Sequence, residues 1–131
     1  MKKIQMVDLM SQYQDIKPAI DSVIVSILES AQFINGPEVK SFQSEMEDYL
    51  GVKHVIPCAN GTDALQIALM ALGLKPGDEV ITPSFTYIAT TEVMALLGLK
   101  PIFVEVDRDT FCIAPDSIEA AISSKTKAIV P

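Results

Sequence analysis

The stretch "VKHVIPCANGTDALQIALMALG", residues 52–73, joins two apolar segments of different periodicity through the small or polar residues "ANGT". Its first part, "VKHVIPC", is short, β-branched and apolar, which predicts a buried strand. Apolar residues then recur with helical spacing at Leu65, Ala68, Leu69 and Leu72. This spacing predicts a helix from about Gly61. A strand that leads directly into a helix is typical of an α/β fold.

Strands and helices alternate in the same way downstream. Strands are predicted at residues 79–82, in "KPIFVEVD" (100–107) and in "TKAIVP" (126–131). Helices are predicted in "SFTYIATTEVMALLG" (84–98) and in "APDSIEAAIS" (114–123), the second opened by Pro115. Alternation at these lengths indicates βαβ units and a mostly parallel sheet covered by helices.

Upstream of residue 52 the chain has only helical patterns. Apolar residues keep one helical face between about Ile16 and Ala31. A second helix is predicted from Pro37 to Gly51, because proline suits the first helical position and glycine a helix end. The prediction is an α/β protein in which an N-terminal helical segment, residues 1–50, precedes an incomplete sheet domain, residues 51–131.

Composition excludes several classes of protein. The formal charge is −7 and Arg108 is the single arginine, so the clustered basic residues of a nucleic-acid surface are absent. The sequence has no apolar run of membrane-span length and no signal peptide pattern, so we expect a soluble cytoplasmic protein without a membrane partner. Cys58 and Cys112 suit neither a disulfide framework nor a zinc site. We expect reduced thiols and no metal.

The junction "ANGT", residues 59–62, is the first candidate site. Ligands of α/β proteins usually bind beyond the carboxyl ends of the strands, where helix N-termini gather. Asn60 suits a helix cap, Gly61 lets the backbone approach a ligand, and the first amides and the Thr62 hydroxyl suit a phosphate. The alternative is a tight turn and cap without a ligand. Neither G-x-G-x-x-G after a strand nor G-x-x-x-x-G-K-[ST] occurs.

The second candidate is "TPSFTYIAT", which also follows a predicted strand. Phe85 and Tyr87 are two residues apart and cannot share a helix face, so one would pack inwards and the other face the cleft. An aromatic ring beside a phosphate site could stack on a flat cofactor. The alternative is that both rings fill the core.

The remaining polar candidates are predicted to be structural. His54 lies inside the predicted strand without a partner histidine or acid. The segment Asp107–Asp109 is expected to form a solvated turn, and Asp78 and Glu79 a pair of loop charges at the opposite edge of the sheet.

The ordered blocks from "NGPEVKSFQSEMEDYLG" through "CANGTDALQ" and "TPSFTYIAT" to "KPIFVEVD" resemble the DegT-type sugar aminotransferases, which are pyridoxal-phosphate (PLP) enzymes of fold type I. The resemblance spans nearly the whole chain. Among the branches it is most similar to enzymes that aminate a 3-keto UDP-sugar, often a uronic acid, for surface polysaccharides. The sheet domain would then be the first half of a PLP-binding large domain.

The resemblance implies roles for the candidate residues. Gly61 and Thr62 match the segment that holds the cofactor phosphate, and Tyr87 matches the aromatic residue stacked on the pyridine ring. The phosphate alternative is therefore favoured over the plain turn. Residues 33–36 match a segment near the active site of such dimers, without an assigned contact. The implied reaction moves an amino group from glutamate to a nucleotide-linked keto-sugar in a homodimeric enzyme.

The resemblance also implies groups that this chain lacks. The lysine that bonds to the cofactor and the aspartate paired with the ring nitrogen are both expected beyond Pro131, so no catalytic residue is assigned. The strand near residues 127–130 has nothing after it to cover the sheet. We therefore expect an N-terminal part that is inactive alone and poorly soluble or molten. The rivals are a truncated or split non-catalytic chain that needs a partner, and a relative with histidine for lysine that dehydrates its sugar.

Overall fold

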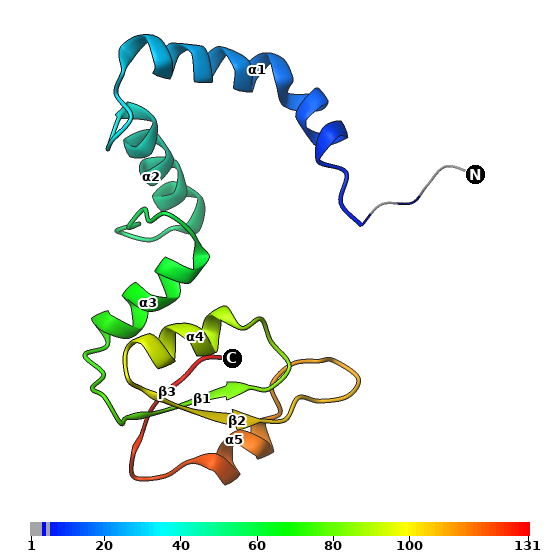
Figure 1. The fold of residues 1–131 in the computed structure, drawn as a ribbon, viewed down its shortest axis with the longest axis vertical. Helices are drawn as coiled ribbons and strands as arrows, with labels where there is room; N and C mark the ends of the chain where they lie inside the picture. The colour runs from blue at the N-terminus through cyan, green and yellow to red at the C-terminus, as the bar shows by residue number, and fades with distance from the viewer. Residues whose placement is uncertain (1–3, 5) are drawn as a thin grey trace. The chain divides into compact units, whose positions relative to one another are not determined.

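The computed structural model describes residue 4 and residues 6–131, and the chain divides between Pro57 and Cys58 into two compact units. The first unit contains α1 (Leu9–Ser30) and α2 (Pro37–Leu50). The second alternates α3 (Gly61–Ala71), β1 (Glu79–Pro83), α4 (Ala89–Leu96), β2 (Lys100–Val104), α5 (Pro115–Ala121) and β3 (Thr126–Ile129) (Figure 1). The predicted α/β class is confirmed. The domain boundary after residue 50 stays a prediction, and residues 1–3 and 5 of that segment lie outside the described residues.

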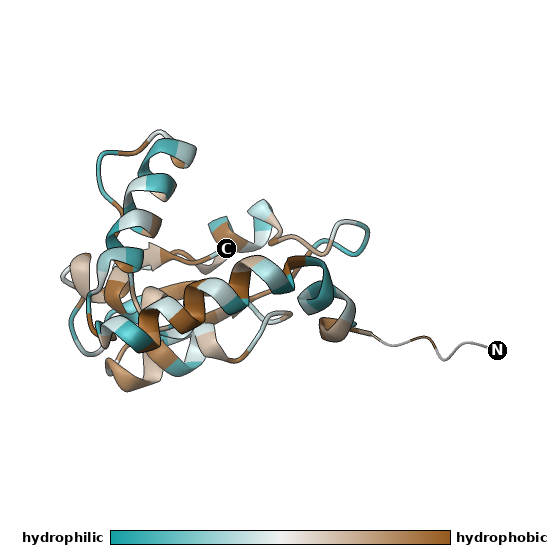
Figure 2. Cartoon of the chain, turned by 90° about the horizontal axis from the view of Figure 1, so that it is seen from above, coloured by the Kyte–Doolittle hydropathy of each residue, from teal (hydrophilic) through white to brown (hydrophobic). Residues whose placement is uncertain are grey.

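Helix α1 begins at Leu9, earlier than the expected Ile16. The Asp8 carboxylate caps it by accepting a hydrogen bond from the Ser11 amide at 3.1 Å. The apolar spacing missed these first turns because they are mostly polar, whereas the cap is an equally local signal. Figure 2 shows hydrophobic residues recurring along this helix, although none of them is buried.

Helix α2 has the predicted bounds, with Pro37 in its first turn and Gly51 in a left-handed conformation after it (φ 65°). The strand predicted directly after it is wrong, because residues 52–58 form no strand and only Val55 among them is not exposed. The Val55 amide donates to the Glu47 carboxylate at 3.0 Å rather than to a neighbouring strand. An apolar run becomes a strand only where another strand satisfies its backbone groups, and none does so among the described residues.

The second unit is built on a parallel sheet of order β2-β1-β3. Figure 1 shows α3 and α4 on one face of this sheet and α5 on the other. The core lies on the α3 and α4 side, where buried Val80 of the central strand clusters with Leu69, Val93, Met94 and Leu99. All five residues of β1 are buried, as expected for a strand with neighbours on both sides and helices on both faces.

Glu79 is not the loop charge that the sequence predicted. It is the first residue of β1 and is 7% exposed. Its carboxylate accepts hydrogen bonds from Ser123 Oγ and, at 3.0 Å, from Lys100 Nζ. These bonds, that of Ser123 first, hold the pKa of the Glu79 carboxyl below its ordinary value. The Glu79 carboxylate therefore links β1 to the start of β2 and to the turn before β3.

Helix α4 begins at Ala89 rather than at Ser84, so residues 84–88 form a loop between β1 and α4. None of the helices in the described part of the chain has the length and apolar character that crossing a membrane requires.

Candidate functional site

The start of α3 has amides that the chain leaves unbonded. Asn60 caps the helix as predicted, since its Oδ1 accepts from the Asp63 amide at 2.9 Å and its carbonyl from the Ala64 amide at 3.1 Å. The amides of Gly61 and Thr62 have no acceptor among the described residues. The first amides of a helix carry the positive end of its dipole, so this turn favours an anion.

The space beside Gly61 is open. A Cβ added to Gly61 would meet no atom within 4 Å, and its φ lies outside the left-handed region. Neither contacts within the chain nor backbone strain therefore demand a glycine at this position. Open space next to unbonded amides is what a phosphate bound by a helix N-terminus requires. The residues thus fit the phosphate of the implied cofactor.

The chain brings Tyr87 to the same edge of the sheet as Gly61 and Thr62. Helices α3 and α4 run opposite to β1, so Figure 1 shows their first turns on the side of the β1 arrowhead. The loop that carries Tyr87 follows β1 directly, and the Ser84 amide anchors it by donating to the Val104 carbonyl at 2.9 Å. The carboxyl ends of parallel strands are the usual ligand edge of an α/β sheet.

Phe85 and Tyr87 do not divide between core and cleft. Phe85 is 66% exposed and Tyr87 is 78% exposed, because both lie in the loop before α4 rather than within a helix. The alternative that both rings fill the core is therefore wrong for this chain. The Tyr87 ring is free to contact a ligand, whereas Phe85 packs on Phe111 with 5.6 Å between ring centroids.

No lysine of Cys58–Pro131 lies at this edge. The lysines of this unit are Lys75, Lys100, Lys125 and Lys127. They precede the strands or stand in the first two strand residues, which is the opposite edge. Lys2 and Lys3 lie outside the described residues. In the sheet unit the arrangement offers phosphate-binding amides and an aromatic ring, but no amine that could bond to a cofactor.

The sequence did not predict a second feature at the carboxyl ends of the strands. A depression of ≈ 680 Å³ is lined by Ser84, Phe85, Glu105, Val106, Arg108 and Phe111. The predicted turn after β2 forms its rim and is solvated, as expected. The Asp107 carboxylate accepts from the Asp109 amide and from the Thr110 amide and hydroxyl. These bonds, those of Thr110 first, lower the pKa of the Asp107 carboxyl.

The local signal for this turn was an aspartate followed three residues later by threonine, which favours a turn that folds the chain back. His54 is exposed and outside any strand, contrary to its predicted strand position. In the described part of the chain, His, Cys, Asp and Glu side chains form no group of three that could hold a metal ion.

Solved structures of aminotransferases share this architecture. The chain is similar to a DegT/DnrJ/EryC1/StrS aminotransferase from Brucella abortus, with 43% identity and a TM-score of 0.92 over 98% of this chain and 36% of that one. It is also similar to NtdA from Bacillus subtilis, solved with bound cofactor PMP, with 37% identity and a TM-score of 0.93 over 98% of this chain and 30% of that one.

Curated relatives are similar over the same share of the chain. UDP-2-acetamido-2-deoxy-3-oxo-D-glucuronate aminotransferase of Pseudomonas aeruginosa is 52% identical over 128 residues, which are 98% of this chain and 36% of the relative. UDP-N-acetyl-3-dehydro-alpha-D-glucosamine 3-aminotransferase of Acidithiobacillus ferrooxidans is 44% identical over 98% of this chain and 35% of the relative. The chain thus spans about a third of the length of these relatives.

The family itself follows from a match that covers most of the sequence. The family model described as the DegT/DnrJ/EryC1/StrS aminotransferase family matches residues 14–131. This range includes the α3 N-terminus and the loop after β1. The chain belongs to the DegT/DnrJ/EryC1/StrS aminotransferase family.

Proposed function

We propose that this chain is the N-terminal part of a PLP-dependent aminotransferase that moves an amino group from glutamate to a nucleotide-linked keto-sugar for surface polysaccharide. Family membership supports the reaction type, and relatives named for UDP-linked 3-oxo and 3-dehydro sugars support the substrate class. The single observation that carries the cofactor site is the pair of unbonded amides at Gly61 and Thr62 beside open space. Following the resemblance, the complete enzyme is a cytoplasmic homodimer.

In this proposal the first turn of α3 holds the cofactor phosphate. The amides of Gly61 and Thr62 donate to the phosphate oxygens, and the Thr62 hydroxyl adds a third donor. The Asn60 cap keeps the turn in place, because it already satisfies the Asp63 amide and leaves the two preceding amides for the ligand. The helix dipole stabilises the negative charge.

Tyr87 orients the cofactor ring. Its exposed side chain stands in the loop after β1, and stacking against a planar ring needs a free aromatic face of this kind. When bound, PLP supplies an electron sink for proton movement at the amino-bearing carbon. The lysine and aspartate that act on the cofactor belong, in this proposal, to polypeptide downstream of Pro131. The role of this chain is to bind and orient.

Replacing Gly61 by valine in the full-length gene product tests the phosphate site. A Cβ there meets nothing, so the free energy of unfolding of the cofactor-free protein should change by no more than about 0.5 kcal/mol, as for other surface substitutions. PLP affinity, measured by absorbance or fluorescence titration, should fall at least about tenfold because the side chain blocks the amides. Ala68→Val, an exposed position later in α3, is the matched control. Undiminished PLP affinity in Gly61→Val would refute the site.

The reaction is tested separately. Full-length protein loaded with PLP is incubated with glutamate and a UDP-linked 3-keto-sugar, and 2-oxoglutarate and the amino sugar are quantified. Both products should appear in equal amounts. A deoxygenated sugar instead of an amino sugar would favour the dehydratase rival, and no turnover by PLP-loaded protein with any nucleotide-linked keto-sugar would contradict the proposal.

A further inference from the structure

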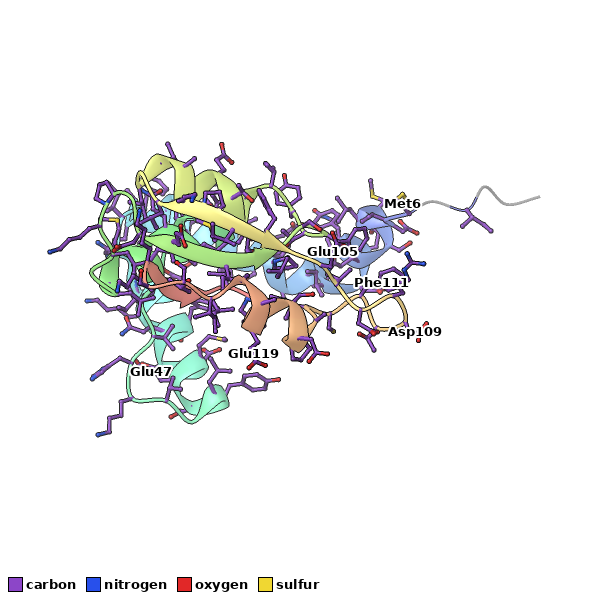
Figure 3. All side chains as sticks on the ribbon, turned by 90° about the horizontal axis from the view of Figure 1, so that it is seen from below. Met6, Glu47, Glu105, Asp109, Phe111 and Glu119 are labelled. Carbon is purple, nitrogen blue, oxygen red and sulfur yellow. The ribbon has the colours of Figure 1, made fainter. Side chains whose placement is uncertain are left out.

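We infer that the depression beyond β1 and β2 binds the uracil ring of the nucleotide-linked substrate. This inference rests on the proposed function and assigns a binding site to residues other than the proposed cofactor residues Gly61, Thr62 and Tyr87. Its lining residues come from the loop after β1, which also carries Tyr87, and from the segment after β2. Figure 3 shows Glu105 and Phe111 in this segment, with Asp109 at its turn.

The depression lies at the carboxyl ends of adjacent strands. Its volume of ≈ 680 Å³ falls within the range of about 300–1,000 Å³ that small-molecule sites occupy. Only Thr86 separates Phe85, on its wall, from Tyr87, the ring that we assign to the cofactor. A substrate bound in the depression would therefore extend from a site next to the cofactor loop.

A β-bridge and backbone hydrogen bonds hold the segment after β2, which forms one wall of the depression. Val106 and Ile113 form an antiparallel bridge, and the Ala114 amide donates to the Glu105 carbonyl at 3.2 Å. Phe111 is held with φ of 58°, a left-handed conformation that is costly for a bulky residue. Its amide donates to the Asp107 carbonyl at 2.9 Å. Non-glycine residues keep such conformations where the surrounding structure imposes them, often at ligand sites.

Two aromatic rings provide a stacking surface. Phe85 and Phe111 are tilted at 38° with centroids 5.6 Å apart, and they remain 66% and 62% exposed. Exposed aromatic faces that are fixed in place attract planar bases, since every base has a π face. A ring rather than an aliphatic chain therefore matches this wall.

The charged side chains of the depression determine which kind of base would fit. Glu105 and Arg108 both line the depression but form no ion pair with each other, so an acceptor and a donor remain available. The uracil edge presents one N–H donor between two carbonyl acceptors, which a carboxylate and a guanidinium complement. Glu105, Asp107 and Asp109 place three carboxylates within three residues of Arg108 along the chain, against its single positive charge. The resulting negative field disfavours a diphosphate here and favours the neutral base.

Binding of UDP and of N3-methyl-UDP to the PLP-loaded full-length protein tests this inference by isothermal titration calorimetry. Phe111→Gly removes the ring while glycine suits the left-handed backbone. It should weaken UDP binding by about 5- to 150-fold, the range for stacking of one base. Methylation of N3 should weaken binding to the wild type by about 10- to 150-fold, as loss of a hydrogen bond to a charged group predicts.

Glu105→Ala should bind UDP and its N3-methyl analogue equally well, because the acceptor of the N3 proton is gone. Phe103→Leu, at an exposed aromatic residue of β2 outside the depression, is the control and should change neither affinity. Equal UDP affinity in wild type and Phe111→Gly, or a wild type that does not distinguish the two nucleotides, would overturn the inference. If those results came with intact PLP loading and amino transfer, the proposed function would stand and the subsite alone would fall.

Discussion

Thr82 of β1 combines complete burial with an unbonded hydroxyl. Its side chain is 0% exposed, and its Oγ1 has no hydrogen-bond partner among the described residues. Side chains alternate along a strand, so Thr82 shares the face of Val80, which α3 and α4 cover. A buried hydroxyl without a partner loses its hydration and gains nothing in return.

Thr82→Val should therefore stabilise the protein. Valine has nearly the same shape, so the substitution removes the polar atom without opening a cavity. The desolvation penalty of an unsatisfied hydroxyl is about 1–3 kcal/mol, and the free energy of unfolding should rise by an amount in that range. Urea unfolding of the full-length protein without cofactor, followed by far-UV circular dichroism, measures the change at constant m-value.

Thr82→Ser is the matched control, because it keeps the hydroxyl and removes the methyl group. It should lower the free energy of unfolding by about 0.8 kcal/mol or more, the value of one buried methylene-sized group. A Thr82→Val variant less stable than the wild type would refute the reasoning, since it would mean that the hydroxyl makes a stabilising bond.

Two further predictions concern the α3 cap and the bonds of Glu79 to Ser123 and Lys100. Asn60→Ala removes the acceptor of the Asp63 amide and should lower the free energy of unfolding in urea by about 0.5–2 kcal/mol. Asn60→Asp should retain most of the cap. Equal losses of stability in both variants would contradict a capping role. The pKa of Glu79 is lowered from 4.5, chiefly by the Ser123 hydrogen bond and then by Lys100. The ionised Glu79 carboxylate therefore stabilises the fold above pH 4.5, and this stabilisation is lost as the pH falls through the folded-state pKa. Glu79→Gln should accordingly be less stable than the wild type at pH 7, with a difference that shrinks below pH 4.5 in thermal melts; a difference independent of pH would show that the charge is irrelevant.

Local signals were enough to predict several elements. Helix α2 begins at Pro37 and is followed by Gly51, and α3 has its predicted Asn60 cap. Caps and helical periodicity act between residues at most a few positions apart, so the printed order of residues contains them completely. The same holds for the turn at Asp107, whose carboxylate bonds only to residues two and three positions away. The sequence also placed Tyr87 after the end of a strand and Gly61 and Thr62 at the start of a helix, although the strand predicted before that helix is absent and contact of these residues with a cofactor stays a prediction.

Contacts between distant residues decided the rest. Residues 52–58 have the composition of a strand, but strand pairing depends on a second segment, and no described segment provides it. Glu79 is buried because Ser123, far along the chain, and Lys100 satisfy its carboxylate. Phe85 and Phe111 meet only because β1 and β2 pair side by side and place the segments that follow them at one edge. Burial and pairing are properties of the assembled sheet, so no local pattern could specify them, whereas caps and turns were already determined by neighbouring residues.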